Sequence, residues 1–171
     1  EWENEFMGAG GGPRGITLVG GAENPRLAQY QGMTLDAIAH AKNQDPRDTV
    51  MDLVLEGDPG FTSYINNEND IQLAIQQPWV AFGTDGGTIA PDGPLSGGLT
   101  HPRSYGSFPK ILGKYVRELG LVRLEEAVRR ATSFPTQILQ IRDRGLLREG
   151  FYADVVIFDP ATIIDRATYI D

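Results

Sequence analysis

The feature that most constrains this chain is an apolar run that leads directly into a carboxylate and a glycine-rich stretch. Residues 78–83, Pro-Trp-Val-Ala-Phe-Gly, are almost wholly apolar, which is typical of a strand buried on both faces of a parallel sheet. The run ends at Thr84-Asp85-Gly86-Gly87. In parallel α/β folds, catalytic groups lie at the C-terminal ends of strands. Asp85 is therefore a candidate catalytic residue and metal ligand.

Two interpretations of Asp85 remain open on spacing alone. A carboxylate fixed at a strand end can bind a divalent metal and accept a proton from a metal-bound water. Alternatively, Asp85 only opens the following loop, because Asp-Gly pairs are common turn formers.

Residues 88–105 follow, rich in glycine and proline and without apolar periodicity, and they predict a long loop of the kind that is often functional. Arg103 is a candidate clamp for a substrate carboxylate, or a surface ion-pair residue. His101 is a candidate ligand or proton carrier, or a hydrogen-bonded loop residue. Tyr105 is a candidate substrate contact, or a packing residue at a helix entrance. His40 falls inside a predicted helix and is interpreted as structural or exposed.

The rest of the chain alternates between strand and helix signals. Strands are predicted at residues 15–20, 61–65 and 154–158 in addition to the apolar run. Helices are predicted after the cap residues Thr34 and Asp45, and from residues 68, 107, 124 and 133. Ser107 is the predicted cap of the helix that runs to about Leu119. This order indicates α/β architecture with an appended β element.

Composition excludes several classes of protein. The formal charge of −8 comes from scattered acids, and no basic cluster forms the footprint of a nucleic-acid binder. No apolar run approaches the roughly 20 residues of a membrane span, so we expect a soluble protein without a membrane partner. The absence of cysteine fits a cytoplasmic location. The chain begins at Glu1 without an initiator methionine, which suggests processing or a fragment.

Several motifs, taken in chain order, resemble the end of an N-acyl-D-amino-acid deacylase of the amidohydrolase superfamily. Gly83-Thr84-Asp85-Gly86 resembles the Gly-Ser-Asp-Gly that closes the last barrel strand in that family. Leu124-Glu-Glu-Ala-Val128 and Thr132-Ser133 match the next helix and its exit. The two longest matches are His101-Pro-Arg-Ser-Tyr-Gly-Ser-Phe-Pro109 and Gly150-Phe-Tyr-Ala-Asp154-Val-Val-Ile-Phe-Asp159-Pro160.

The resemblance implies a zinc-dependent hydrolysis of an N-acyl-D-amino acid to a carboxylate and a free D-amino acid. Asp85 then corresponds to the metal-site aspartate that also acts as general base. Arg103 corresponds to the arginine that binds the substrate carboxylate, with His101 and Tyr105 as further substrate-binding candidates.

The resemblance also implies that the chain is part of a larger enzyme. Residues 1–145 would form the closing strands and helices of a TIM-type barrel with inserted helices, and residues 146–171 the C-terminal strands of a small β-sandwich domain. A whole barrel needs about 250 residues, and the family's other metal-binding histidines lie upstream of the matching region. We therefore expect this chain alone to be inactive, and its partner to be the missing N-terminal part or an oligomeric neighbour.

Two rival functions remain open. One is a different amidohydrolase, such as a dihydropyrimidinase-like cyclic amidase, which shares the C-terminal motif. The other is a non-catalytic scaffold with an amidohydrolase-like fold.

Overall fold

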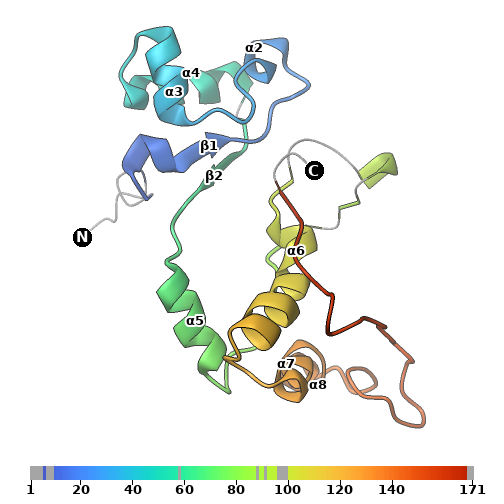
Figure 1. The fold of residues 1–171 in the computed structure, drawn as a ribbon. Helices are drawn as coiled ribbons and strands as arrows, with labels where there is room; N and C mark the ends of the chain where they lie inside the picture. The colour runs from blue at the N-terminus through green and yellow to red at the C-terminus, as the bar shows by residue number, and fades with distance from the viewer. Residues whose placement is uncertain are drawn as a thin grey trace. The chain divides into compact units, whose positions relative to one another are not determined.

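The computed structural model describes residues 6, 10–57, 59–87, 89–90, 92–95 and 100–168. Contacts divide the chain into two compact units (Figure 1). Unit 1 comprises Glu1–Asn66, Thr88–His101 and Thr168–Asp171, and unit 2 comprises Asn67–Gly87 and Pro102–Ala167. The chain therefore enters unit 2 at residue 67, returns to unit 1 for residues 88–101, and is again in unit 2 from residue 102 to 167.

Unit 1 contains a two-stranded antiparallel sheet packed with three helices that lie between its strands in the sequence (Figure 1). Strand β1 pairs with β2 in the register Ile16↔Ser63, Thr17↔Thr62 and Leu18↔Phe61. The predictions of strands at 15–20 and 61–65 are confirmed, although the two strands pair with each other and are antiparallel. The elements are η1 (Gly12–Gly15), β1 (Ile16–Leu18), α2 (Pro25–Ala28), α3 (Leu35–Lys42), α4 (Pro46–Gly57), β2 (Phe61–Ser63) and η2 (Gly93–Leu95).

The core of unit 1 forms where α2, α3 and α4 meet β1. Its fully buried members are all leucine or isoleucine side chains: Leu18, Leu27, Leu35, Ile38 and Leu53. The predicted caps position these helices. The Thr34 hydroxyl accepts a hydrogen bond from the Ala37 amide at 3.3 Å, and the Asp45 carboxylate accepts one from the Arg47 amide at 2.9 Å.

The regular elements of unit 2 are helices, and its described residues from 139 to 167 form neither helix nor strand. Its elements are α5 (Glu68–Gln76), α6 (Arg103–Lys110), the π-helix η3 (Ile111–Glu118), α7 (Leu124–Ala131) and α8 (Ser133–Ile138). Figure 1 shows α6 and η3 as one continuous helical rod. The buried side chains of this unit are few, and they include Ile75, Tyr115, Ala127 and, unusually, Arg130.

The helix predicted to begin at Ser107 begins instead at Arg103. Ser107 is not a cap, because its hydroxyl donates to the Arg103 carbonyl oxygen at 2.7 Å, within the helix. Pro109 lies inside α6, and the turns after it widen to the π form, in which the Leu119 amide donates to the Lys114 carbonyl at 2.9 Å. Arg103 and Tyr105 therefore lie on a helical turn, not in the predicted loop, of which residues 88, 91 and 96–99 lie outside the described part.

Two predicted strands are wrong for the described residues. Residues 78–83 and 154–158 form no β-ladder, and β1 and β2 make up the sheet that the described residues contain. A strand exists only through pairing with a neighbour, and here the Phe82 amide donates to the Arg130 carbonyl at 3.2 Å. In the second run, Val156 and Ile157 are 84% and 94% exposed.

Gly20 lets the chain pass close to Gly60 beside the sheet. The amides of Val19 and Gly20 both donate to the Gly60 carbonyl oxygen, at 2.8 and 3.1 Å. A Cβ on Gly20 would lie 2.6 Å from the Gly60 backbone nitrogen, whereas a Cβ on Gly60 would meet no atom closer than 3.5 Å. The close approach therefore excludes a side chain at residue 20 but not at residue 60.

We expect Gly20→Ala to lower the free energy of unfolding by about 1–3 kcal/mol, because the new methyl group overlaps backbone atoms that are held by two hydrogen bonds. Urea denaturation followed by circular dichroism measures this. Gly60→Ala is the matched control and should change stability by less than about 0.5 kcal/mol. Equal effects of the two substitutions would contradict the described close approach.

Candidate functional site

Asp85 lies in a tight turn at the end of the segment that carries it. Its φ of 49° is in the left-handed region, which aspartate and asparagine tolerate better than most residues. The Thr84 hydroxyl accepts a hydrogen bond from the Gly86 amide at 3.1 Å, closing the turn around Asp85. The turn-forming role is thus real, and it leaves the carboxylate 89% exposed and available for other contacts.

The structure brings Asp85 and Arg103 together. The Arg103 Nη2 lies 3.1 Å from the Asp85 Oδ2, and the Arg103 side chain is 44% exposed. Gly86 makes the approach possible, since a Cβ there would lie 2.8 Å from Ser104 Oγ and 3.1 Å from Ser104 Cα. An ion pair this open to solvent contributes at most about 1 kcal/mol to stability. The pairing therefore matters because it places the predicted metal ligand and base beside the arginine predicted to bind the substrate carboxylate.

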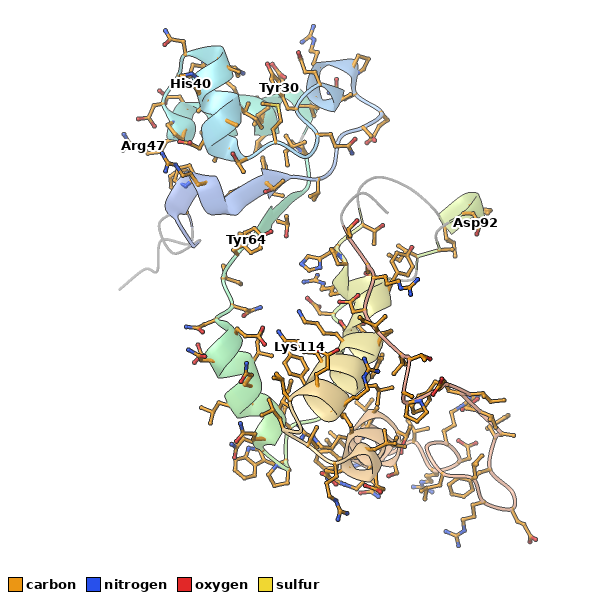
Figure 2. The ribbon with its side chains drawn as sticks, viewed as in Figure 1. Tyr30, His40, Arg47, Tyr64, Asp92 and Lys114 are labelled. Carbon is orange, nitrogen blue, oxygen red and sulfur yellow. The ribbon has the colours of Figure 1, made fainter. Side chains whose placement is uncertain are left out.

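The other predicted site residues divide between the units. Tyr105 lies on the first turn of α6, two residues after Arg103, and is 40% exposed. His101 belongs to unit 1, so its grouping with Asp85 stays a prediction. His40 is exposed on α3, as expected (Figure 2). The substrate-binding and catalytic roles of all four site residues likewise remain predictions.

Sequence reasoning missed Arg130, a buried arginine that contacts the Asp85 segment, residues 77–84, which leads from α5 to Asp85. Its side chain is only 1% exposed. The Nε donates to the Val80 carbonyl at 2.6 Å, the Nη1 donates to the Ile75 carbonyl, and the guanidinium lies 4.2 Å from the centre of the Phe82 ring. Burial lowers the pKa of Arg130. The only sequence signal is a pair of arginines in the last turn of a helix, which usually indicates an exposed, dipole-stabilised position.

A second charged cluster joins α5 to η3. The Glu68 carboxylate accepts hydrogen bonds from Lys114 Nζ at 2.7 Å and from Tyr115 Oη at 3.4 Å (Lys114 is labelled in Figure 2). Hydrogen bonding to Lys114 lowers the pKa of Glu68, although its burial opposes this. Burial, together with the Glu68 charge, raises the pKa of Tyr115 to about 12. These contacts make the cluster a connection between two helices.

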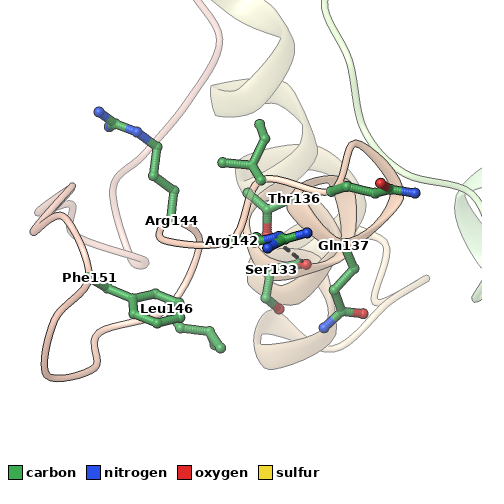
Figure 3. Close-up of a pocket in the computed structure, with 9 residues that line it drawn as sticks. Ser133, Thr136, Gln137, Arg142, Arg144, Leu146 and Phe151 are labelled. Carbon is green, nitrogen blue, oxygen red and sulfur yellow. Dashed lines mark hydrogen bonds between the residues drawn. The ribbon is translucent and has the colours of Figure 1, made fainter.

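A groove of about 410 Å³ lies beside α8 (Figure 3). Ser133, Thr136, Arg142, Arg144 and Phe151 are among the residues that line it, and Thr136 Oγ1 donates to the Ser133 carbonyl at 2.9 Å. Arg144 also binds Asp154 at 2.6 Å. None of the predicted site residues lines this groove.

Asp85 is the candidate metal ligand that the described residues supply at the Asp85–Arg103 pair. A zinc ion needs three or four protein ligands, of which a carboxylate such as Asp85 can be one. In the described ranges, no three histidine, cysteine, aspartate or glutamate side chains gather closely enough to hold a metal. The described helices are also too short or too polar to cross a membrane. Asp85 therefore fits a metal site as a single contributor.

Sequence comparison identifies the family to which the chain belongs. A model described as "Amidohydrolase family" matches residues 19–169, so the chain belongs to the amidohydrolase family. A D-aminoacylase of Alcaligenes xylosoxydans xylosoxydans is 36% identical over 141 residues, which are 82% of this chain and 27% of that protein. An N-acyl-D-glutamate deacylase of the same organism is 39% identical over 110 residues, which are 64% of this chain and 21% of that protein.

Solved structures give the same answer for the fold. The N-acyl-D-glutamate deacylase of Bordetella bronchiseptica, crystallised with zinc and a phosphonate mimic of the tetrahedral intermediate, matches with a TM-score of 0.77 and 33% identity, over 91% of this chain and 30% of that one. A D-aminoacylase crystal structure matches with a TM-score of 0.77 and 32% identity, over 92% of this chain and 31% of that one. The chain thus has the fold of part of these amidohydrolases and spans less than a third of their length.

The Tyr115 environment predicts a late phenol titration. Because the neutral phenol is favoured in the folded state, its contribution to stability is complete below pH 10 and is lost as the pH rises through about 12. In an ultraviolet titration of tyrosinate, one of the six tyrosines should ionise last, and Tyr115→Phe should remove that component. Glu68→Gln should shift it to lower pH without restoring an ordinary value, because burial remains. A Tyr115→Phe titration identical in shape to the wild type, apart from amplitude, would contradict this.

Proposed function

We propose that this chain is the C-terminal part of a zinc-dependent amidohydrolase that hydrolyses N-acyl-D-amino acids to a carboxylate and a D-amino acid. The observation that carries the proposal is the approach of Arg103 to Asp85, at 3.1 Å. An N-acyl-amino acid contains two groups that match this pair. Its amide is the bond that Asp85 would help to hydrolyse, and its carboxylate is the group that Arg103 would bind. Support comes from relatives of 34–39% identity, which are named D-aminoacylase, N-acyl-D-glutamate deacylase and N-acyl-D-aspartate deacylase.

The two residues have complementary tasks in this proposal. Asp85 contributes one ligand to the metal and accepts the proton of the attacking water. Arg103 fixes the substrate through its carboxylate, which holds the scissile amide near Asp85. His101 and Tyr105 provide further substrate contacts. The zinc ion, when bound, polarises the amide carbonyl and lowers the pKa of water.

The site requires more chain than is described here. We propose that the remaining metal ligands come from the missing N-terminal part of the enzyme or from an oligomeric partner, so that this chain alone is inactive. In the same proposal, residues 1–145 close a TIM-type barrel and residues 146–171 belong to a β-sandwich domain. A cytoplasmic location also remains part of the proposal, with small N-acyl-D-amino acids as ligands and neither nucleic acid nor membrane as partner.

Asp85→Asn in the full-length protein separates the catalytic role from the turn-forming one. Asparagine tolerates the left-handed backbone of residue 85 but cannot act as a base, so kcat should fall by about 10²–10⁴-fold. The free energy of unfolding should change by less than about 0.5 kcal/mol. Steady-state kinetics and thermal denaturation measure the two effects. Full activity in Asp85→Asn would leave Asp85 with the turn as its only role.

Arg103→Ala in the same protein should mainly weaken substrate binding, by about 2–5 kcal/mol, because a charge-assisted pair to the substrate carboxylate is lost. The increase in KM should vanish for a substrate whose carboxylate is replaced by a carboxamide. Arg123→Ala is the matched control, since Arg123 is an exposed arginine of the same unit with a longer ion pair, 3.8 Å to Glu125. An unchanged KM for the acid substrate would remove Arg103 from the site.

Substrate profiling of the wild-type protein tests the assignment itself. N-acetyl-D-amino acids should be hydrolysed, with their L-enantiomers and cyclic imides much poorer. Hydrolysis of cyclic imides alone would favour the dihydropyrimidinase-like alternative, and no hydrolysis by the zinc-loaded full-length protein would favour a non-catalytic scaffold.

A further inference from the structure

The segment that carries Asp85 is held by side chains of α7, although it pairs with no strand in the described part of the chain. Arg130 Nε and Nη1 donate to the carbonyl oxygens of Val80 and Ile75, and the Arg130 carbonyl accepts from the Phe82 amide. The same guanidinium stacks on the Phe82 ring. One residue thus contacts the backbone or ring of three residues over an eight-residue stretch that ends three residues before Asp85.

A neighbouring arginine reinforces the contact without being buried. Arg129 Nη2 donates to the Pro78 carbonyl at 3.1 Å, while its main partner is the Glu126 carboxylate at 2.7 Å. The last turn of α7 therefore binds three carbonyl oxygens, that of Ile75 in the last turn of α5 and those of Pro78 and Val80 in the segment that follows. Cations are favourable at this end of a helix, where the helix dipole is negative.

Burying Arg130 is costly, and the structure shows that the cost is only partly offset. Its Nη2 is buried and has no hydrogen-bond partner among the described residues. An apolar side chain of similar volume would fill this space without an unpaired donor, so stability alone does not explain an arginine here. What an apolar side chain cannot supply is the rigid fork that fixes two carbonyl oxygens at once.

Asp85 lies between two such restraints. On one side, Arg130 holds the chain at Val80 and Phe82. On the other, Gly86 is so close to Ser104 at the start of α6 that a Cβ could not fit without displacement. With both flanks held, the backbone of the turn at residues 84–86 has little freedom to move Asp85.

We propose that Arg130 is a positioning residue for the hydrolytic reaction: its grip on the Ile75 and Val80 carbonyls sets the path of the segment and hence the place of the Asp85 carboxylate. This inference rests on the proposed function of Asp85. Arg130 itself touches no reacting group. Its effect is on the geometry of the base and not on the binding of substrate, because the carboxylate clamp, Arg103, lies on α6.

Arg130→Met in the full-length protein tests the inference. Methionine keeps most of the apolar stem but removes the fork, so kcat for N-acetyl-D-amino acids should fall by about 10- to 100-fold, the effect of a displacement near 1 Å, while KM stays within about threefold. Arg130→Lys keeps the charge but can reach only one carbonyl at a time, and it should recover part of the loss. If Arg130→Met does not fold, the kcat and KM of Arg130→Lys decide the question.

Arg117→Met is the matched control. Arg117 also binds two backbone carbonyls, those of Pro160 and Ile163, but in a segment remote in sequence from Asp85. Its kcat should stay within about twofold of the wild type. Equal losses of kcat in Arg117→Met and Arg130→Met, or a wild-type kcat in Arg130→Met, would overturn the proposal.

Amide hydrogen exchange gives a readout that does not depend on activity. In Arg130→Met, the amides of Val80 to Gly86 should exchange faster, and those of α6 should not change. If the wild type is active but exchange and kcat are unaffected by the substitution, the positioning role fails alone. If the wild type lacks deacylase activity, the proposed function fails, and faster exchange would still support the grip of Arg130 on the segment.

Discussion

The hydrogen bonds from Arg130 to backbone carbonyls are the interaction on which the candidate site depends. The Asp85 segment is largely apolar and begins with a turn at Pro78 and Trp79. It pairs with no strand among the described residues, so its carbonyl groups need donors from elsewhere. A helix end rich in arginine supplies them. Hydrogen bonds from the buried Arg130 and its neighbour Arg129 thus hold this segment, where a neighbouring strand would hold it in a sheet.

The site itself is built from two local structures that meet at a glycine. The first is the turn at residues 84–86, closed by the Thr84 hydroxyl, and the second is the opening turn of α6, which presents Arg103. Gly86 allows the two to approach until the Arg103 and Asp85 side chains come within 3.1 Å. Their approach brings the two predicted site residues, an acid and an arginine, into one place.

Local signals in the sequence predicted local structure well. The helices after Thr34 and Asp45 begin where a side-chain oxygen accepts a hydrogen bond from a backbone amide. Such caps can be predicted because both partners lie within four residues of each other in the sequence. The strands expected at 78–83 and 154–158 failed because a strand depends on a distant neighbour. Ser107 misled because serine can bond back to the preceding turn as well as cap a new one. Family motifs, not spacing, indicated that Asp85 and Arg103 share a site, and nothing distinguished Arg130 from an exposed arginine.

The exposed run from Val155 to Ile157 gives the chain a tendency to aggregate. Three consecutive exposed β-branched residues are a template for intermolecular strand pairing, the first step of aggregation. Asp154 and Asp159 flank the run and act as charged gatekeepers. Hydrogen bonds from Ala161 and Thr162 lower the pKa of Asp159, so that this gatekeeper keeps its charge further into the acid range than an ordinary aspartate. We expect the tendency of the chain to aggregate to depend on the charge of these two carboxylates.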